Sequence, residues 1–193
     1  MIVGGKVRSP ASGETYEIKN GYLDLLQSRV GADNFANLTN FLPGAGPAYE
    51  PLWRVHSLTL LAGEPFPSEH ELRIISDLVG LKHGGTYLDL GCSAGLYARN
   101  LARLLDGRGE VVGIDISPSM LEEASRRARK TGARPSFVRA DAHNLPFADA
   151  SFSGAVRVFE PDELGSLFDH AGLDPDPPRT HGLIFFLGAS RRG

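Results

Sequence analysis

The 193-residue sequence has very little cysteine, no long apolar run and no excess of basic residues. Its single cysteine, Cys92, excludes an internal disulfide framework. Twenty Lys and Arg against 23 Asp and Glu give a net charge of −3, which argues against nucleic acid as a partner. The apolar run 183–187 is far below the ~18 residues of a membrane span, and the first residues lack a secretory apolar region. We therefore expect a cytoplasmic protein without a membrane span.

A strand that runs into a glycine-containing turn, over residues 87–95, is the most informative feature present. Leu88 and Leu90 give the apolar alternation of a buried strand, and Gly91 and Gly95 allow a tight turn against a ligand. Apolar residues at helical spacing follow, and the amides at a helix N-terminus point toward whatever binds there. Alone, such a turn is more often part of an ordinary loop than a binding site.

Two further strands change that interpretation. Residues 110–115 are mostly apolar and end in Asp115, about 20 residues after the turn, where an acidic residue meets ribose hydroxyls. Residues 136–140 are followed by Asp141. With helical patterns at 94–105 and 117–131 between them, these strands predict an α/β fold: a Rossmann-like, doubly wound, mostly parallel sheet whose carboxyl edge lines one crevice.

The glycine spacing distinguishes between cofactors. A dinucleotide-binding turn starting at Gly91 requires glycine at 93 and glycine or alanine at 96, where this chain has Ser93 and Leu96. The stretch instead resembles the D-x-G-x-G-x-G motif of class I S-adenosylmethionine-dependent methyltransferases, with Asp89, Gly91 and Gly95 matching and Ser93 at the middle glycine. The likeness continues through residues 111–121 and 137–152 and is greatest to the small-molecule branch that includes ubiquinone- and menaquinone-biosynthesis enzymes.

The resemblance implies a site for S-adenosylmethionine, with S-adenosylhomocysteine as product, and a small-molecule substrate. Asp89 would neighbour the methionine moiety, Asp115 would accept hydrogen bonds from the ribose hydroxyls, and Asp141 would accept one from the adenine amine. The other implied cofactor-binding residues are Gly91, Cys92, Ser93, Gly95, Ile116, Met120 and Ala142. Simpler roles stay open, since Asp115 caps a helix and Asp141 starts a turn in the alternative interpretation.

The first 67 residues are expected to be accessory. Residues 1–30 resemble a degenerate zinc-ribbon-like hairpin leader in which Ser9 and Ser12 replace cysteines, so we expect no metal. Residues 31–67 are interpreted as a lid or linker, and 68–193 as the methyltransferase domain. The spacing predicts a helix over 68–79, with Ser68 as its cap and Glu71 three residues later, covering the first strand.

The region after the fourth strand is shorter than the family pattern. Residues 151–156 run directly into 158–164, so the domain is expected to be truncated internally near 156, without one central strand and one crossover helix. We predict that the final strand, 182–189, pairs with the fourth strand, because an unpaired central edge is unfavourable. In the alternative, a partner chain fills the gap by strand exchange and forms a homodimer.

No catalytic residue is assigned from the sequence. His143 follows the adenine-contacting pair and Tyr49 lies in the lid, which makes them the candidates, and the other histidines show no metal spacing. Two classes therefore remain open: a methyltransferase acting on a small molecule, and a catalytically impaired relative that binds the cofactor or acts as a partner-dependent subunit. A nucleic-acid methyltransferase is disfavoured because Asn144-Leu145-Pro146-Phe147, which faintly resembles N-P-P-Y, precedes the fourth strand.

Overall fold

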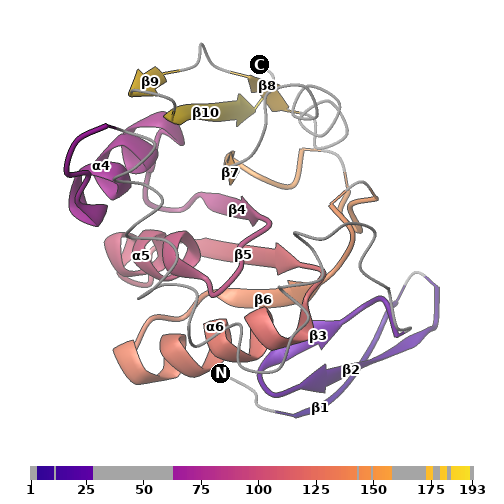
Figure 1. Cartoon of the computed structure of the whole chain (residues 1–193). Coiled ribbons are helices and arrows are strands. Elements are labelled where there is room, and N and C mark those ends of the chain that lie inside the picture. The colour runs from indigo at the N-terminus through magenta and orange to yellow at the C-terminus, as the bar shows by residue number, and fades with distance from the viewer. Residues whose placement is uncertain are drawn as a thin grey trace.

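The computed structural model describes residues 4–10, 12–27, 63–142, 144–148 and 150–157, and the backbone of three strands between 173 and 191. The candidate residues Tyr49 and His143 lie outside the described residues, as does most of the predicted lid segment 31–67. Figure 1 shows the described elements around one sheet.

In the described part of the chain, ten strands form this sheet, in the order β1-β2-β3-β6-β5-β4-β7-β10-β8, with β9 paired to β10. The strands are β1 (Gly5–Arg8), β2 (Thr15–Lys19), β3 (Tyr22–Asp24), β4 (Thr86–Leu90), β5 (Glu110–Asp115), β6 (Ser136–Arg139), β7 (Gly154–Arg157), β8 (Leu173–Pro175), β9 (Arg179–His181) and β10 (Ile184–Arg191). The helices are α4 (Ser68–Leu78), α5 (Leu96–Leu105) and α6 (Pro118–Thr131).

The centre of the sheet is parallel and has the predicted Rossmann-like topology. Strands β3, β6, β5, β4 and β7 pair in parallel with their neighbours. From β4 the chain passes through α5 to β5 and through α6 to β6 on one side, and β7 pairs with β4 on the other side. This reversal of strand order at β4 is the position at which open α/β sheets bind ligands, at the carboxyl ends of the strands.

The final strand closes the sheet, as predicted. β10 pairs antiparallel with β7, and Ala189 lies opposite Ala155. β7 therefore has β4 on one side and β10 of the same chain on the other. This arrangement protects the β7 edge without a strand from a partner chain.

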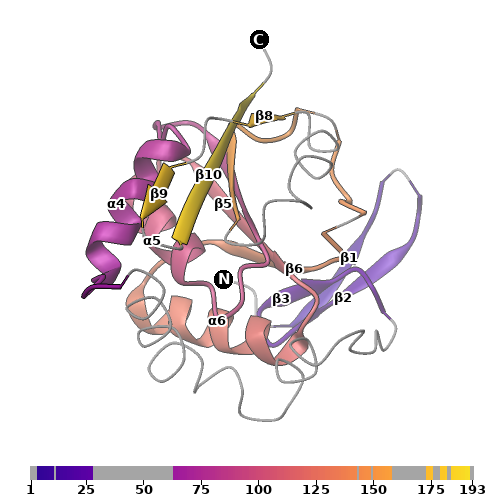
Figure 2. The same cartoon turned by 45° about the horizontal axis from the view of Figure 1, so that its top comes forward.

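Both faces of the central sheet are buried. Tyr87 and Phe137 belong to a core cluster with residues of the three described helices, which lie on one side of the sheet in Figure 2. Leu88, Leu90 and Ile114 belong to a second cluster, and the alternation along β4 places it on the opposite face. Burial on both faces is typical of parallel sheets. Among the described helices, none has the length and apolar character needed to cross a membrane.

Helix α6 begins and ends with clear local signals. The side chain of Ser117 accepts a hydrogen bond from the Met120 amide, and Pro118 occupies the first turn. Gly132 ends the helix in the left-handed conformation. Because Ser117 is the cap, the alternative role of Asp115 as the cap of this helix is wrong.

The predicted cap of helix α4 is also wrong. Ser68 is already helical, Pro67 occupies the N-cap position, and no side-chain capping hydrogen bond forms. Glu71 turns into the protein core instead, where its carboxylate accepts a hydrogen bond from the hydroxyl of Tyr97 on α5. The helix packs against α5 and β10, and Ile75 shares a core cluster with Tyr87 of β4. Helix α4 therefore covers β4, the first strand of the parallel centre, less directly than we predicted.

The N-terminal strands β1, β2 and β3 form an antiparallel meander that belongs to the main sheet, because β3 pairs with β6. In the turn after β1, the Ser12 amide donates to the Ser9 Oγ at 3.2 Å, and the Ser12 Oγ accepts from the Glu14 amide at 3.3 Å. The two serines thus make ordinary turn hydrogen bonds. Within the described ranges, no group of three or more His, Cys, Asp or Glu is placed to hold a metal. The zinc-ribbon origin of this segment stays a prediction.

Candidate cofactor site

The carboxyl ends of β4, β5 and β6 meet at one edge of the sheet (Figure 1). Asp89 lies opposite Gly113, and Asp115 lies opposite Arg139. The segments that leave this edge are 91–95, 116–117 and 140–142, which carry most of the residues selected from the sequence. Asp89 and Asp115 lie in β4 and β5 themselves, and Met120 lies in α6. The topology therefore brings these residues together, as expected for strands that run in the same direction.

The loop after β4 is held tightly against β5. Gly91, Ser93 and Gly95 have φ angles of 65°, 47° and 73°, in the left-handed region. The Ser93 amide donates to the Asp115 Oδ2 at 2.8 Å, and the Cys92 amide donates to the carbonyl of Ile114 at 2.8 Å. Ser93 is the one non-glycine residue of the three, so its backbone is strained relative to a glycine.

Gly95 is required by packing within the protein. A Cβ atom at this position would lie 2.9 Å from the Cβ of Ala124 and 2.9 Å from the ring of Phe137. The glycine therefore allows the start of α5 to lie close to α6 and β6. The resemblance implied that Gly95 serves the approach of the cofactor. In this structure the space beside its Cα is filled by protein.

Asp115 has a fixed orientation at the end of β5. Its Oδ2 accepts from the Ser93 amide and its Oδ1 from the Ser117 amide, each at 2.8 Å. The side chain is half-buried. Burial raises the pKa of Asp115, and the hydrogen bonds from the Ser117, Ser93 and Ile116 amides oppose that rise. Because each carboxylate oxygen has a further lone pair, Asp115 retains capacity to accept from a ligand.

Asp89 supports the first turn of α5. Its side chain is only 1% exposed, and its Oδ2 accepts from the amide of Ala98 at 2.9 Å. A carboxylate bonded to one of the first amides of a helix satisfies a donor that has no partner in the helix and complements the helix dipole. Its implied place beside the methionine moiety stays a prediction.

The residues implied for the adenine side differ in exposure. Ile116, Asp141 and Ala142 are half-buried, whereas Met120 is 1% exposed and belongs to the core. Of Ile116 and Met120, Ile116 is thus the one that presents surface. The Asp141 carbonyl accepts from the Asn144 amide at 3.1 Å, so Asp141 starts a turn, as the alternative interpretation held. That bond uses the backbone and leaves the implied role of the carboxylate untested.

Cys92 is a buried packing residue beneath the loop. Its side chain is 6% exposed, and a Cβ on Gly113 would lie 3.0 Å from its Sγ. Burial raises the pKa of the Cys92 thiol well above its usual value, and the charges of Asp89 and Asp115 add to that effect. The thiol is therefore protonated at neutral pH, which is unsuited to a nucleophile.

Arg139 and Asp24 contribute to this edge and were not predicted from the sequence. The Nε of Arg139 donates to the carbonyl of Ile116 at 3.1 Å, and its Nη1 lies 3.4 Å from both carboxylate oxygens of Asp24. The sequence signal that could have pointed to Arg139 is its charge, because 136–140 is otherwise an uncharged and mostly apolar strand. Its partner is 115 residues away in the sequence, and no local pattern connects the two.

Comparisons with known proteins find a similarity to methyltransferases. Residues 88–170 match the family model described as a methyltransferase domain. A 2-phytyl-1,4-naphtoquinone methyltransferase of Trichormus variabilis is 42% identical over 79 residues, which are 40% of this chain and 34% of that protein. The ubiquinone/menaquinone biosynthesis C-methyltransferase UbiE of Haemophilus ducreyi is 35% identical over 89 residues, which are 45% of this chain and 34% of that protein.

A solved structure supports the fold. The TehB-like SAM-dependent methyltransferase from Corynebacterium glutamicum superimposes with a TM-score of 0.51 and 17% identity, over 78% of this chain and 100% of that chain. At this identity the likeness concerns the fold alone. The chain spans about a third of the length of the curated relatives it matches. Residues 88–170 are thus similar to a methyltransferase domain, and the curated relatives named above are methyltransferases.

Proposed function

We propose that the protein transfers a methyl group from S-adenosylmethionine to a small-molecule acceptor. The cofactor would bind at the edge formed by the loop 91–95, Asp115 and residues 140–142. The observation that carries the proposal is the Asp115 carboxylate, which two amides orient and which is only half-buried at the end of β5. In this fold, an acid at that place is suited to hydrogen bonding with ribose hydroxyls.

The residues of the site have separate roles in this proposal. Asp115 accepts from the ribose, Ile116 packs on the adenine ring, and Asp141 with the Ala142 amide recognises the adenine edge. Asp89 holds α5, whose first amides lie beside the glycine-containing loop. When bound, S-adenosylmethionine supplies a methyl group on a sulfonium, which an aligned acceptor displaces. The proposal involves no metal, and Tyr49 and His143 remain the candidates for handling a proton.

The acceptor is proposed to be small and apolar or aromatic. The names of two curated relatives refer to a naphthoquinone and to ubiquinone and menaquinone biosynthesis. Quinone-like acceptors are therefore the first to include in a substrate panel.

Binding is tested with S-adenosylhomocysteine in a thermal unfolding experiment. The ligand should raise the melting temperature, since a ligand at a hundred times its Kd stabilises the folded state by about 2.7 kcal/mol. Asp115→Ala should remove most of that gain. Glu110→Ala removes an exposed carboxylate at the opposite end of the same strand and should leave the gain intact. No shift of the wild-type protein at millimolar ligand would reject the proposed site.

Turnover is tested by methyl transfer from labelled S-adenosylmethionine to a panel of quinone-like and other aromatic acceptors. Asp89→Ala should lower the rate, because it removes the hydrogen bond that orders the start of α5 beside the site. Binding of S-adenosylhomocysteine without transfer to any acceptor of the panel would instead indicate a cofactor-binding protein that lacks activity toward them.

A further inference from the structure

A row of charged residues crosses five neighbouring strands and ends at the proposed ribose-binding residue. In register, Lys6 lies opposite Glu17, Glu17 opposite Asp24, Asp24 opposite Arg139, and Arg139 opposite Asp115. Residues directly opposite each other in a sheet project from the same face. This charged row therefore connects the N-terminal meander to the candidate cofactor site.

The inner part of the charged row is buried. Asp24 is 1% exposed and Arg139 is 6% exposed, and the two form an ion pair at 3.4 Å. The same guanidinium donates through Nε to the carbonyl of Ile116 at 3.1 Å. Arg139 thus joins the end of β3 to the residue that directly follows Asp115.

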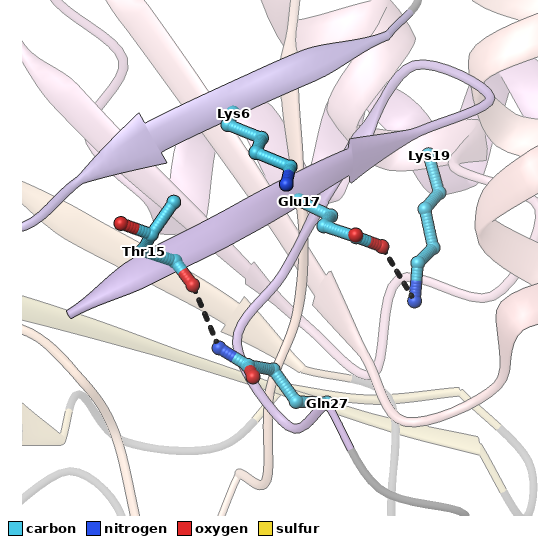
Figure 3. Close-up of a pocket in the computed structure, with 5 residues that line it drawn as sticks. All are labelled: Lys6, Thr15, Glu17, Lys19 and Gln27. Atoms are coloured by element: carbon cyan, nitrogen blue, oxygen red, sulfur yellow. Dashed lines mark hydrogen bonds and ion pairs between the residues drawn. The ribbon is translucent and has the colours of Figure 1, made fainter.

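The outer part of the charged row lies at the surface. Lys6, Thr15, Glu17, Lys19 and Gln27 line a hollow of about 290 Å³ that Figure 3 shows. Lys19 contacts Glu17 at 3.4 Å and Asp24 at 2.9 Å. Exposed ion pairs contribute little because solvent screens them. The outer residues are therefore suitable controls for the buried pair.

Asp24 is held ionised by its surroundings. Its burial acts to raise the pKa of the carboxyl, but the hydrogen bonds from Lys19 and from the Gln27 amide, with the charge of Arg139, outweigh that effect and lower the pKa. An ionised Asp24 is the partner that a buried guanidinium requires, since an unpaired buried charge is strongly unfavourable. Loss of the Asp24 charge would therefore release Arg139 from its position.

A movement of Arg139 would alter the candidate site through the backbone of residues 116 and 117. Ile116 directly follows Asp115, and the Ser117 amide, one residue further, donates to the Asp115 Oδ1 at 2.8 Å. A shift of the Ile116 carbonyl therefore displaces a donor that orients the carboxylate. We propose that Asp24 and Arg139 are positioning residues for the nucleoside half of the cofactor, an inference that rests on the proposed function. In this proposal the meander is a structural part of the cofactor site.

Calorimetric titration of folded variants tests the inference, with S-adenosylhomocysteine and adenosine as ligands. Asp24→Asn and Arg139→Lys should each raise the Kd for both ligands by on the order of tenfold, the effect of one charged hydrogen bond. Arg139→Lys keeps the positive charge but has no Nε in place to reach Ile116. Glu17→Gln makes the same charge change as Asp24→Asn at an exposed position and should stay within about twofold of wild type.

Amide NMR spectra of the ligand-free variants provide a readout that does not depend on binding. The Ile116 and Ser117 signals should move in Asp24→Asn and stay in place in Glu17→Gln. Wild-type affinity in both Asp24→Asn and Arg139→Lys would overturn the inference and leave the proposed function intact. Failure of wild type to bind either ligand would overturn both. An equal loss of affinity in Glu17→Gln would also overturn it, because a general charge effect would then explain the result.

Discussion

Single residues set the geometry of the loop between β4 and α5. Ser93 adopts a left-handed backbone conformation and still donates its amide to Asp115. A side chain in this conformation costs about 1 kcal/mol relative to glycine. The chain therefore maintains a strained residue at the place where the family pattern has a glycine.

Ser93→Gly should relieve this strain. We expect the free energy of unfolding to rise by about 0.5–1 kcal/mol and the affinity for S-adenosylhomocysteine to increase. Chemical denaturation and calorimetric titration measure the two effects. Ala94→Gly is the matched control, because Ala94 is buried and is not among the residues with positive φ, so glycine there should destabilise. A less stable Ser93→Gly protein would contradict the strain argument.

For single residues, the sequence spacing predicted where Asp115 lies but did not predict most of the contacts around the site. An acid at the end of the second strand is a local pattern, and the parallel topology places it at the edge. The bond from Asp89 to the Ala98 amide depends on how α5 lies against β4, which spacing does not determine. The Asp24–Arg139 pair depends on the pairing of β3 with β6, two strands far apart in the sequence.

Among the elements, α6 combines strong local signals with a buried carboxylate. Glu123 is 4% exposed at its side chain and forms ion pairs at 2.6 Å with Arg126 and with Arg127. The hydrogen bond from Arg126 is the main cause that lowers the pKa of Glu123, to about 2. The folded protein therefore keeps this carboxylate ionised at a pH where an unfolded chain is protonated.

Glu123→Gln should lower the free energy of unfolding by about 1–2 kcal/mol at pH 7. Since the folded pKa lies below the unfolded value, the contribution of Glu123 is complete above about pH 5 and is lost as pH falls toward 2. Denaturation curves between pH 7 and pH 3 should thus converge for the two proteins. Glu122→Gln, at the neighbouring exposed position, should change stability by less than about 0.5 kcal/mol. If the difference in free energy of unfolding between the two proteins grew as pH fell, the predicted direction of the pH dependence would be wrong.

The ends of a helix were predictable where capping residues lie next to them in the sequence. The sequence pattern for 117–131 predicted α6 closely because Ser117, Pro118 and Gly132 act locally. The cap of α4 was not predictable in the same way. Glu71 has a tertiary partner in Tyr97, and this contact competes with the capping arrangement that the spacing favoured.

On the scale of the whole molecule, strands from distant parts of the sequence border the parallel centre. The meander reaches β6 through β3, and β10 reaches β7. Pairing of the final strand, β10, with β7 was predictable, because the shortening that we inferred after residue 156 left an edge that a strand must cover. Which residues lie opposite each other was not, since register depends on side-chain packing across the sheet.

Deletion of residues 182–193 should therefore destabilise the protein strongly. It removes β10, exposes the edge of β7 and removes a surface on which α4 packs. We expect a loss of about 3–5 kcal/mol, from several hydrogen bonds of about 1 kcal/mol each together with lost packing, and association through the open edge. Light scattering and thermal unfolding measure both effects. Deletion of residues 192–193 alone, which follow β10, should leave the melting temperature and the scattering unchanged.

The place of β10 also has a consequence for synthesis on the ribosome. The four strands β4 to β7 end at residue 157, but β10, the outer neighbour of β7, ends at residue 191 and leaves the ribosome later than β7. During that interval the nascent chain exposes a strand edge that is prone to pair with other chains. A longer interval between the release of β7 and that of β10 from the ribosome should therefore increase the dependence of this protein on chaperones.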